Sequence, residues 1–597
     1  MIFSAIKSVF TKSFYLLLIT FTVNAQTVKL KIIETSDVHG AILPYDLVND
    51  TTTTSSLAQV HSYVNMERNL SGQSVVLLDN GDILQGDPLV YYYNYEDTTS
   101  TNIYAQAMNF MNYDAATIGN HDIETGHNVY DKFKDEINFP WMAANAVNAQ
   151  TGEPYFKPYT VIEKEGVKIA VLGLITPAIP HWLPKTLWEG IEFEDMIEAA
   201  NKWVKIINEK ESPDLLIGLL HAGIDYTYNN STKETYKNEN ASRLVAEQVP
   251  GLDIVFAGHD HAGWNFKTVN VNNDSVLILG PLSRARTVAV ATVTMRLDST
   301  FNKWATANIT GEIVEIAKYR PDNHFMSKFM MNLSIVGNYV AKPLGEITQS
   351  ISSKASIFGP SEFIDLIHTF QLENTNADIS FAAPLSFNAE IDRGWINVRD
   401  MFKLYRFENF LYTMELSGQE IKDYLEYSFA GWFNQMTLPE DHVLKFQLDE
   451  NGKIVYSERS RSPMLVQRYY NFSSAAGINY TVDITKPAGE RVNIKSLSNG
   501  SPFVFTEKYE VAINSYRGNG GGGHLTGGAG IPQDELSNRV INSTDKDLRF
   551  YLMRWIQKKK KITPKIIGNW KVVPVNLWVP GKEKDYKILY ENKKVRR

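Results

Sequence analysis

Side chains that can bind a metal ion gather in five short segments of the sequence. The segments are Asp37-Val38-His39, Gly81-Asp82, Gly119-Asn120-His121-Asp122, His221-Ala222-Gly223 and Gly258-His259-Asp260-His261. Imidazole and carboxylate groups bind divalent metals, and an asparagine amide oxygen can join them. Any one segment could be an ordinary polar turn. Together they hold five of the 12 histidines, which is not the pattern of scattered surface or core histidines.

Each segment directly follows an apolar run that predicts a buried strand. The runs are 28–33, 74–78, 115–117, 214–220 and 253–257, and a further strand, 167–175, ends without a ligand and is interpreted as scaffold. Helical spacing over 195–210 indicates that helices lie between some of the strands. Ligands bind beyond the carboxyl ends of strands in α/β sheets. We therefore expect the five segments to converge at one end of the strands.

Such a set of side chains suits a site for two metal ions. Two divalent ions about 3.5–4 Å apart can share a bridging carboxylate, polarise a phosphoryl group and activate a water between them. Mixed imidazole and oxygen ligands favour Zn, Mn, Fe or Co over Ca. The chain has no cysteine, so a metal site must use histidine, aspartate, asparagine or glutamate.

In this order the five segments resemble those of the calcineurin-like metallophosphoesterases and, more narrowly, the 5′-nucleotidase and 2′,3′-cyclic-nucleotide 2′-phosphodiesterase/3′-nucleotidase family. The resemblance implies a hydrolase of phosphoric esters that uses two divalent ions, Zn, Mn or similar, and metal-activated water. It also implies the ligands: Asp37, His39 and His261 for one ion, Asn120, His221 and His259 for the other, and Asp82 as the bridge.

The resemblance further implies that His121 is the catalytic histidine, which stabilises the transition state or protonates the leaving oxygen. The family often orients this histidine with an aspartate three residues further on. That position is Glu124 in this chain, and Asp122 is the rival orienting group.

Two aromatic segments of the second half are candidates for binding a nucleobase. Residues 468–472 precede a predicted strand, and Tyr516-Arg517 leads into four consecutive glycines, 520–523. Glycine lets the backbone approach a ligand closely, and an aromatic ring stacked on a base contributes about 1–3 kcal/mol. The resemblance implies that Phe472 and Tyr516 clamp the base, with Arg517 in the same substrate-binding loop. Core packing is the alternative for Phe472, and Tyr470 competes with it.

The second half departs from the 5′-nucleotidase branch of the family. Region 352–362 has only Lys354 where that branch carries phosphate-holding arginines, and 383–387 lacks its glycine-rich, arginine-ending motif. The form of loop 514–517 favours the cyclic-phosphodiesterase/3′-nucleotidase branch. We therefore expect the substrate to be a 2′,3′-cyclic nucleotide, a 3′- or 5′-nucleotide, or more than one of these. The alternatives are a nucleotide-sugar or other ester hydrolase and a non-catalytic nucleotide-binding protein, and the intact ligand set argues against the latter.

A length of 597 residues predicts two or more domains. The resemblance implies an α/β first lobe, 27–325, built as a four-layer α/β/β/α sandwich, and a smaller α+β substrate domain, 345–560. Helical spacing indicates a helix between them, a linker over 326–344 or a cap of the first lobe. We expect a strand over 402–416 and a helix over 418–429. Residues 561–597 are expected to form a basic tail, exposed to solvent or able to bind a polyanion.

The first 25 residues have the pattern of an export signal. Two lysines precede a short apolar core, 14–23, and Ala25 is a small residue suited to cleavage. A retained anchor is the alternative, but the apolar run falls short of the roughly 20 residues that span a bilayer. We expect an exported protein, periplasmic or extracellular, with no membrane span after cleavage. The net charge of −8 argues against binding polymeric nucleic acid, and the oligomeric state stays open.

Overall fold

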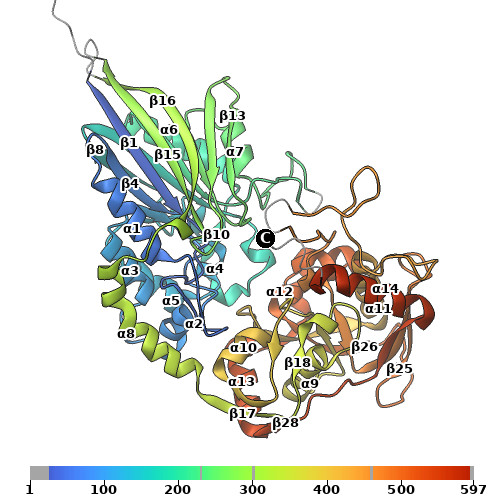
Figure 1. The fold of residues 1–597 in the computed structure, drawn as a ribbon. Helices are drawn as coiled ribbons and strands as arrows, with labels where there is room; N and C mark the ends of the chain where they lie inside the picture. Colours follow the sequence, from blue (N-terminus) through green and yellow to red (C-terminus); the bar gives the residue numbers. More distant parts are fainter. Residues whose placement is uncertain (1–25, 229–230, 299–302, 458–460, 592–597) are drawn as a thin grey trace, which may run out of the picture.

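The computed structural model describes residues 26–228, 231–298, 303–457 and 461–591. The expected export signal, 1–25, therefore lies outside the described residues. The chain forms two lobes, and helix α8 (Asn323–Val340) runs from the first lobe to the second (Figure 1). Asp322 begins this helix, because its carboxylate accepts the main-chain N–H of Phe325. Helix α8 contacts the first lobe at α1 (Leu57–Arg68) and α2 (Pro88–Tyr91), and the second at α10 (Val398–Leu404).

The first lobe is built on two six-stranded sheets. The first sheet has the order β16 (Lys303–Glu315), β15 (Thr287–Asp298), β1 (Thr27–Thr35), β4 (Ser74–Asp79), β5 (Ala115–Thr117) and β6 (Trp141–Met142). The second has the order β13 (Trp264–Val269), β14 (Ser275–Gly280), β12 (Ile254–Ala257), β11 (Leu215–His221), β9 (Val167–Ile175) and β8 (Tyr159–Lys164). Each sheet contains four adjacent strands that are parallel to one another. They are β1, β4, β5 and β6 in the first sheet and β9, β11, β12 and β14 in the second.

The two sheets face each other and helices cover their outer surfaces. Alternate residues of β1, such as Leu30 and Ile32, pack against Ile169 and Ile217 of the second sheet in a shared core. Helices α1, α3 (Ile103–Met111) and α5 (His127–Glu136) cover the outer face of the first sheet, and α6 (Met196–Lys210) and α7 (Ser242–Gln248) cover that of the second. This arrangement confirms the expected four-layer α/β/β/α fold.

The sheets lie close to each other near the carboxyl ends of their parallel strands. Gly173 of β9 has no room for a side chain, because a Cβ atom there would lie 2.4 Å from the Cβ atom of Met142 on the opposite sheet. Thr117 at the end of β5 donates its hydroxyl hydrogen to the carbonyl oxygen of Leu219 on β11 at 3.0 Å. Loops that leave the two sheets at this edge are therefore held close together.

The second lobe is centred on a five-stranded sheet. Its order is β23 (Ser474–Ala476), β19 (Ile379–Ala382), β26 (Lys508–Asn514), β22 (Leu411–Ser417) and β27 (Val540–Ser543). Helices α9 (Glu362–Thr375) and α11 (Gly418–Trp432) pack on it, and Phe381 of β19 stacks on Tyr424 of α11 with 4.0 Å between ring centroids. The helix expected over 418–429 is thus present.

Two expectations for the second lobe are wrong. The strand expected over 402–416 begins only at Leu411, because residues 398–404 form helix α10, whose start is fixed by the Asp400 carboxylate accepting the Asn397 N–H at 2.8 Å. The described part of the expected basic tail is folded. Strand β28 (Lys561–Ile562) pairs with β17 (Pro343–Ile347), β29 (Trp570–Val573) pairs with β24 (Ile478–Asp483), and helix α14 (Val575–Tyr586) follows. Buried Trp570 explains why this basic segment folds.

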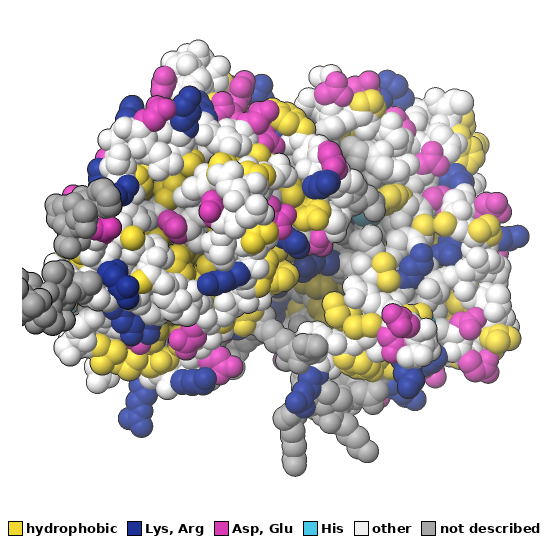
Figure 2. Space-filling view, turned by 90° about the horizontal axis from the view of Figure 1, so that it is seen from above, with side chains coloured by type: hydrophobic (Ala, Val, Ile, Leu, Met, Phe, Trp, Pro, Cys, Tyr) yellow, Lys and Arg dark blue, Asp and Glu magenta, His cyan; other side chains and the backbone are white. Residues whose placement is uncertain are grey.

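The lobes meet through a buried polar contact as well as through α8. Tyr91 donates to an Asp547 carboxylate oxygen, and Tyr95 to a Glu408 carboxylate oxygen, each at 3.0 Å. The Arg549 guanidinium lies 2.8 Å from the other oxygen of Glu408 and 4.6 Å from the centre of the Tyr91 ring. Away from this contact a furrow separates the lobes, with basic side chains along part of it (Figure 2).

Within residues 26–591, apart from the short gaps given above, each helix is too short or too polar to cross a bilayer.

Candidate metal centre

Four of the predicted ligands from three loops form one cluster. The carboxylates of Asp37 and Asp82 and the imidazoles of His39 and His261 each offer an atom that lies within 4.8 Å of the others. The Nε2 atoms of His39 and His261 are 3.0 Å apart, and the His261 Nε2 atom lies 3.2 Å from an Asp37 carboxylate oxygen. All except His261 are buried.

A second cluster shares Asp82 with the first. Asp82, His221 and His259 also offer atoms within 4.8 Å of one another. The amide oxygen of Asn120 lies between the two imidazoles, 2.8 Å from Nδ1 of His259 and 3.2 Å from Nε2 of His221. The structure therefore brings together all seven residues that the resemblance implies as ligands, in the two groups that it implies.

Three glycines allow these loops to touch. A Cβ atom on Gly119 would lie 2.2 Å from a carboxylate oxygen of Asp82, and one on Gly81 would lie 2.5 Å from the main-chain nitrogen of Gly119. A Cβ atom on Gly258 would lie 2.3 Å from the hydroxyl oxygen of Ser36. The glycines beside Asp82, Asn120 and His259 are thus required by the close approach of neighbouring loops, rather than by a local turn alone.

The backbone of the ligand loops is strained. Five of the seven candidate ligands have positive φ angles between 47° and 71°: Asp37, His39, Asp82, His259 and His261. Residues other than glycine rarely adopt positive φ angles, and those that do cluster at functional sites where the surrounding structure holds them. The convergence of these side chains is therefore maintained against a local conformational cost.

Hydrogen bonds at the outer ring nitrogens orient two of the histidines. The Nδ1 atom of His39 lies 3.1 Å from the carbonyl oxygen of Gln85, and that of His221 lies 2.5 Å from the carbonyl oxygen of Asn80. A carbonyl oxygen can accept a hydrogen bond but cannot donate one, so the ring nitrogen that faces it, Nδ1, carries the proton. The lone pair of Nε2 then faces the cluster, as a metal ligand requires.

The side chains fit a pair of divalent ions. The Oδ2 atom of Asp82 is buried without a hydrogen bond, although the Nε2 atom of His221 lies 3.3 Å away. A buried carboxylate oxygen without a partner is costly, and a cation between the two clusters would satisfy it. Burial favours the neutral acid, but His221 and His121 together hold the pKa of the Asp82 carboxyl well below its usual range.

The structure distinguishes between the two candidate orienting groups for His121. The Nδ1 atom of His121 lies 2.5 Å from an Oε2 atom of Glu124. Asp122 instead accepts the main-chain N–H groups of Gly119, Asp82 and others, so it holds loops together. Burial disfavours charge on the His121 ring, but the carboxylates of Asp82 and Glu124 outweigh it and raise its pKa to about 9. A protonated imidazole thus faces the ligand clusters.

The predicted aromatic clamp is only partly supported by burial. Tyr516 is half-buried in the glycine-rich loop, against the backbone of Gly521. Burial raises the pKa of its phenol against the charge of Arg517, and the hydroxyls of Tyr470 and Tyr228 add to the rise. Tyr470 is also half-buried, and Tyr228 reaches this region from the first lobe. These three tyrosines therefore share one neighbourhood.

Phe472 lies in the core and not beside Tyr516. Its side chain is 1% exposed and stacks on Trp432, with ring centroids 5.4 Å apart and planes 14° apart. The chain turns inward after the short helix Tyr469–Asn471 to enter β23, and this turn carries the ring into the core. The expectation that Phe472 clamps the base is therefore corrected, whereas its competitor Tyr470 stays partly accessible, as does Tyr469.

The Arg517 side chain likewise points into the protein. Its side chain is buried and donates to the carbonyl oxygens of Gly521 and Tyr470, at 2.5 and 2.8 Å, and to the amide oxygen of Asn471 at 3.1 Å. The guanidinium ties the glycine-rich loop to the segment that carries Tyr470. The expectation that Arg517 contacts the substrate is therefore corrected, because its side chain holds these two loops together.

Sequence reasoning missed residues that contact the clusters from distant loops. Trp182 and Glu239 both contact His259. Both residues lie several positions beyond the ends of β9 and β11, rather than directly at a strand end, so only their place in the folded chain distinguishes them.

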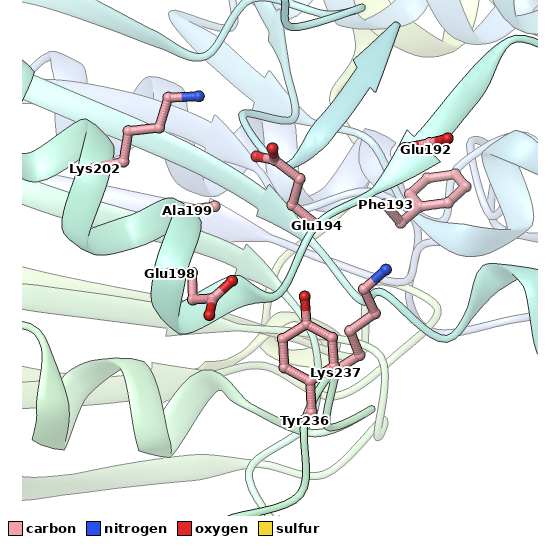
Figure 3. Close-up of a pocket in the computed structure, with 8 residues that line it drawn as sticks. All are labelled: Glu192, Phe193, Glu194, Glu198, Ala199, Lys202, Tyr236 and Lys237. Atoms are coloured by element: carbon pink, nitrogen blue, oxygen red, sulfur yellow. The ribbon is translucent and has the colours of Figure 1, made fainter. Parts of the chain in front are cut away.

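A surface depression of about 380 Å³ lies elsewhere on the first lobe (Figure 3). It is lined by Glu192, Phe193, Glu194, Glu198, Ala199, Lys202, Tyr236 and Lys237. No candidate ligand borders it, and its mixture of carboxylates and lysines lacks the convergence of the ligand clusters.

Two family descriptions match the chain. The calcineurin-like phosphoesterase description matches residues 30–263, and that of the 5′-nucleotidase C-terminal domain matches residues 340–527. The first range contains every candidate ligand, and the second contains the segments of Tyr470 and Tyr516.

Curated relatives match over nearly the whole chain. The 2′,3′-cyclic-nucleotide 2′-phosphodiesterase/3′-nucleotidase of Salmonella typhimurium is 27% identical over 94% of this chain and 91% of its own length. The trifunctional nucleotide phosphoesterase protein YfkN of Bacillus subtilis is 28% identical over 92% of this chain, which spans only 39% of that protein. A 5′-nucleotidase of Vibrio cholerae is 25% identical over 67% of this chain and 75% of its own length.

A solved structure shares the fold. The putative 5′-nucleotidase from Staphylococcus aureus superposes with a TM-score of 0.73 at 19% identity, covering 91% of this chain and 99% of that one.

Proposed function

The chain belongs to the metallophosphoesterase family in which a calcineurin-like phosphoesterase domain precedes a 5′-nucleotidase C-terminal domain, and from this premise we propose that it is a two-metal hydrolase of nucleotides. Its relatives are hydrolases named as nucleotidases and phosphodiesterases. The proposed substrates are 2′,3′-cyclic nucleotides, 3′- or 5′-nucleotides, or more than one of these.

The observation that carries the proposal is the position of Asp82 between the two ligand clusters. Its carboxylate belongs to both groups, and one of its oxygens is buried without a hydrogen bond. Asp37, His39 and His261 would hold one ion with it, and Asn120, His221 and His259 the other. When bound, two such ions supply charge to polarise a phosphoryl group and lower the pKa of a water.

The side chains of the protein supply proton transfer and orientation. His121 carries its proton on the side facing the clusters, while Glu124 accepts from Nδ1 and fixes the ring. The leaving oxygen of a nucleotide ester is a sugar hydroxyl, which must gain a proton as it departs. His121 gives up that proton from Nε2, and the remaining hydrogen bond to Glu124 keeps the imidazole in place for the next turnover.

The second lobe binds the nucleoside part in this proposal. Tyr516 and Tyr470 are the half-buried aromatics whose loops Arg517 joins, and a nucleobase can stack on such rings. Trp182 of the first lobe accepts a hydrogen bond from Asn519 of the glycine-rich loop at 3.3 Å. This contact supports a binding site in which both lobes take part.

The organisation of the chain is part of the proposal. Residues 27–325 form the phosphoesterase domain, 326–344 the linker helix, and the substrate domain begins near 345 and includes the folded segment 561–591. Residues 1–25 act as an export signal, which makes the protein periplasmic or extracellular. The pattern of lysines, a short apolar core and Ala25 supports export.

A panel of substrates tests the function. Purified protein is freed of metal, loaded with Mn²⁺ or Zn²⁺, and assayed for phosphate or nucleotide release from 5′-, 3′- and 2′,3′-cyclic nucleotides. We expect turnover of at least one class, loss of it with chelator and recovery with either metal. Absence of turnover of all three by protein that holds two ions would contradict a nucleotide hydrolase.

A further inference from the structure

His259 is held differently from His39 and His221, the two buried histidines of the clusters. His39 and His221 direct Nδ1 to main-chain carbonyl oxygens. His259 instead directs Nε2 to a side chain, with 3.2 Å to an Oε1 atom of Glu239, and its Nδ1 faces Asn120. The ring orientation of this one histidine therefore depends on a removable side chain.

Hydrogen bonds fix the main chain that carries the Glu239 side chain. The hydroxyl of buried Thr176 donates to the main-chain carbonyl of Glu239 at 2.9 Å. On either side, Asn238 accepts the N–H of Asn240 at 2.9 Å, and Asn240 donates to the carbonyl of Asp225 at 3.1 Å. The Glu239 side chain is 22% exposed, so it is neither loose on the surface nor sealed in the core.

A second contact fixes the plane of the same ring. Trp182 stacks on His259 with ring centroids 5.5 Å apart and planes 23° apart. The indole is in turn anchored through its main chain, because the Trp182 carbonyl accepts from Asn519 at 3.3 Å. A hydrogen bond along the ring edge and a stack on the ring face together leave the imidazole little freedom to rotate.

We propose that Glu239 and Trp182 are positioning residues that build the second ion site by fixing His259. The inference rests on the proposed function, since it concerns how one of the two ions is held. Glu239 accepts the Nε2 proton, which leaves the lone pair on Nδ1 facing Asn120 and Asp82. Trp182 holds the ring in that plane and connects the site to the glycine-rich loop of the second lobe. The His259 imidazole is not a member of the first cluster, and it is the main-chain N–H of His259, not its ring, that donates to Asp37 of that cluster at 3.1 Å.

Metal titration of the whole protein tests the proposal without any substrate. Protein freed of metal is titrated with Mn²⁺ by calorimetry, and bound metal is counted after dialysis at graded Mn²⁺ concentrations. We expect wild type to take up two ions. In Glu239→Leu, which removes the acceptor, the second ion should bind about 10–100-fold more weakly while the first binds as in wild type. Trp182→Leu should show the same selective loss.

Two further variants provide the control and the rescue. Glu239→Gln keeps an oxygen that can accept from Nε2, so it should lose less affinity than Glu239→Leu. Glu234→Gln alters an exposed glutamate of the same loop that forms an ion pair with Lys233, and it should bind both ions as wild type does.

Three outcomes would overturn the inference. Wild-type affinity for both ions in Glu239→Leu and Trp182→Leu would show that His259 needs neither residue. Equal weakening of both ions, with a lower melting temperature, would show a role in folding alone. Uptake of fewer than two ions by wild type would contradict the proposed function as well, whereas two ions in wild type with unaffected variants would contradict this inference only.

Discussion

Replacing His121 with asparagine separates the chemistry of one side chain from the metal centre. The main-chain N–H of residue 121 donates to an Asp82 carboxylate oxygen at 2.8 Å, and the substitution keeps this bond. The imidazole belongs to neither ligand cluster, although its ring lies 5.4 Å from that of His39. We therefore expect the variant to fold and to bind both ions.

The expected loss of rate in His121→Asn follows from the role of His121 as a proton donor. Asp82 and Glu124 stabilise the charged ring and raise its pKa to about 9 against the effect of burial, which suits a proton donor. A positioned acid contributes about 10²–10⁴-fold to the rate. At 1.36 kcal/mol for each factor of ten, this is about 3–5.5 kcal/mol of the barrier. Because the group acts on the leaving oxygen, kcat should fall far more than KM rises.

The assay compares two leaving groups. A nucleotide releases a sugar hydroxyl, which needs a proton, whereas bis(p-nitrophenyl) phosphate releases an acidic phenol, which does not. His121→Asn should therefore lose much more activity on the nucleotide. Glu124→Gln removes the charge beside the ring and lowers its pKa. His121 acts while it is protonated, so the rate falls as the pH rises through the pKa of His121. In Glu124→Gln the alkaline limb of the rate profile should therefore move to lower pH.

Several results would refute this reasoning. Loss of an ion from His121→Asn would make His121 a ligand, and undiminished nucleotide turnover would remove it from catalysis. An equal loss on both substrates would show that it stabilises charge rather than protonating the leaving group. His127→Asn is the matched control, because His127 pairs with Asp131 on α5 and lies in neither cluster.

Asp82→Ala should abolish turnover and lower metal content at both sites, since its carboxylate belongs to both clusters; elemental analysis showing two ions at wild-type occupancy would contradict this. Tyr516→Ala should weaken nucleotide binding by about 1–3 kcal/mol and spare bis(p-nitrophenyl) phosphate, whereas equal loss on both with a lower melting temperature would indicate packing. Phe472→Ala removes a ring that is 1% exposed and should cost about 3–5 kcal/mol of stability, measured by urea unfolding, with unchanged KM. Burial raises the pKa of the Glu408 carboxyl to about 7, against the charge of Arg549. The contribution of Glu408 to stability is therefore fully present below the pKa it has in the unfolded chain, and it is lost as the pH rises towards 7. Glu408→Gln should therefore flatten the decline in melting temperature over that range, and an unchanged decline would contradict the assignment.

The sequence alone determined the main features of the first lobe. Apolar runs ending in ligand-type residues predicted the strands, and β9 has the predicted bounds of 167–175. The reason is that a strand buried between two layers must be apolar along its length, while the loop after it is free to be polar. The position of Asp82, Asn120 and His221 just after predicted strands therefore predicted that they converge.

Only the tertiary structure decided which of several plausible neighbours a side chain meets. Glu124 and Asp122 are both close to His121 in sequence, and the helical turn at residue 120 places Glu124 on the ring nitrogen and Asp122 on the loop amides. Phe472 has an aromatic side chain of the kind that could stack on a base, but the inward turn before β23 buries it.

The same limit applies to contacts between distant segments. The basic segment after residue 560 has a charge pattern typical of a tail, and yet Trp570 and the pairing of β29 with β24 fold it into the second lobe. Glu239 reaches His259 across a loop that carries no periodic signal. Sequence periodicity reports whether a side chain is buried, and the identity of its partners depends on how whole sheets and loops are brought together in space.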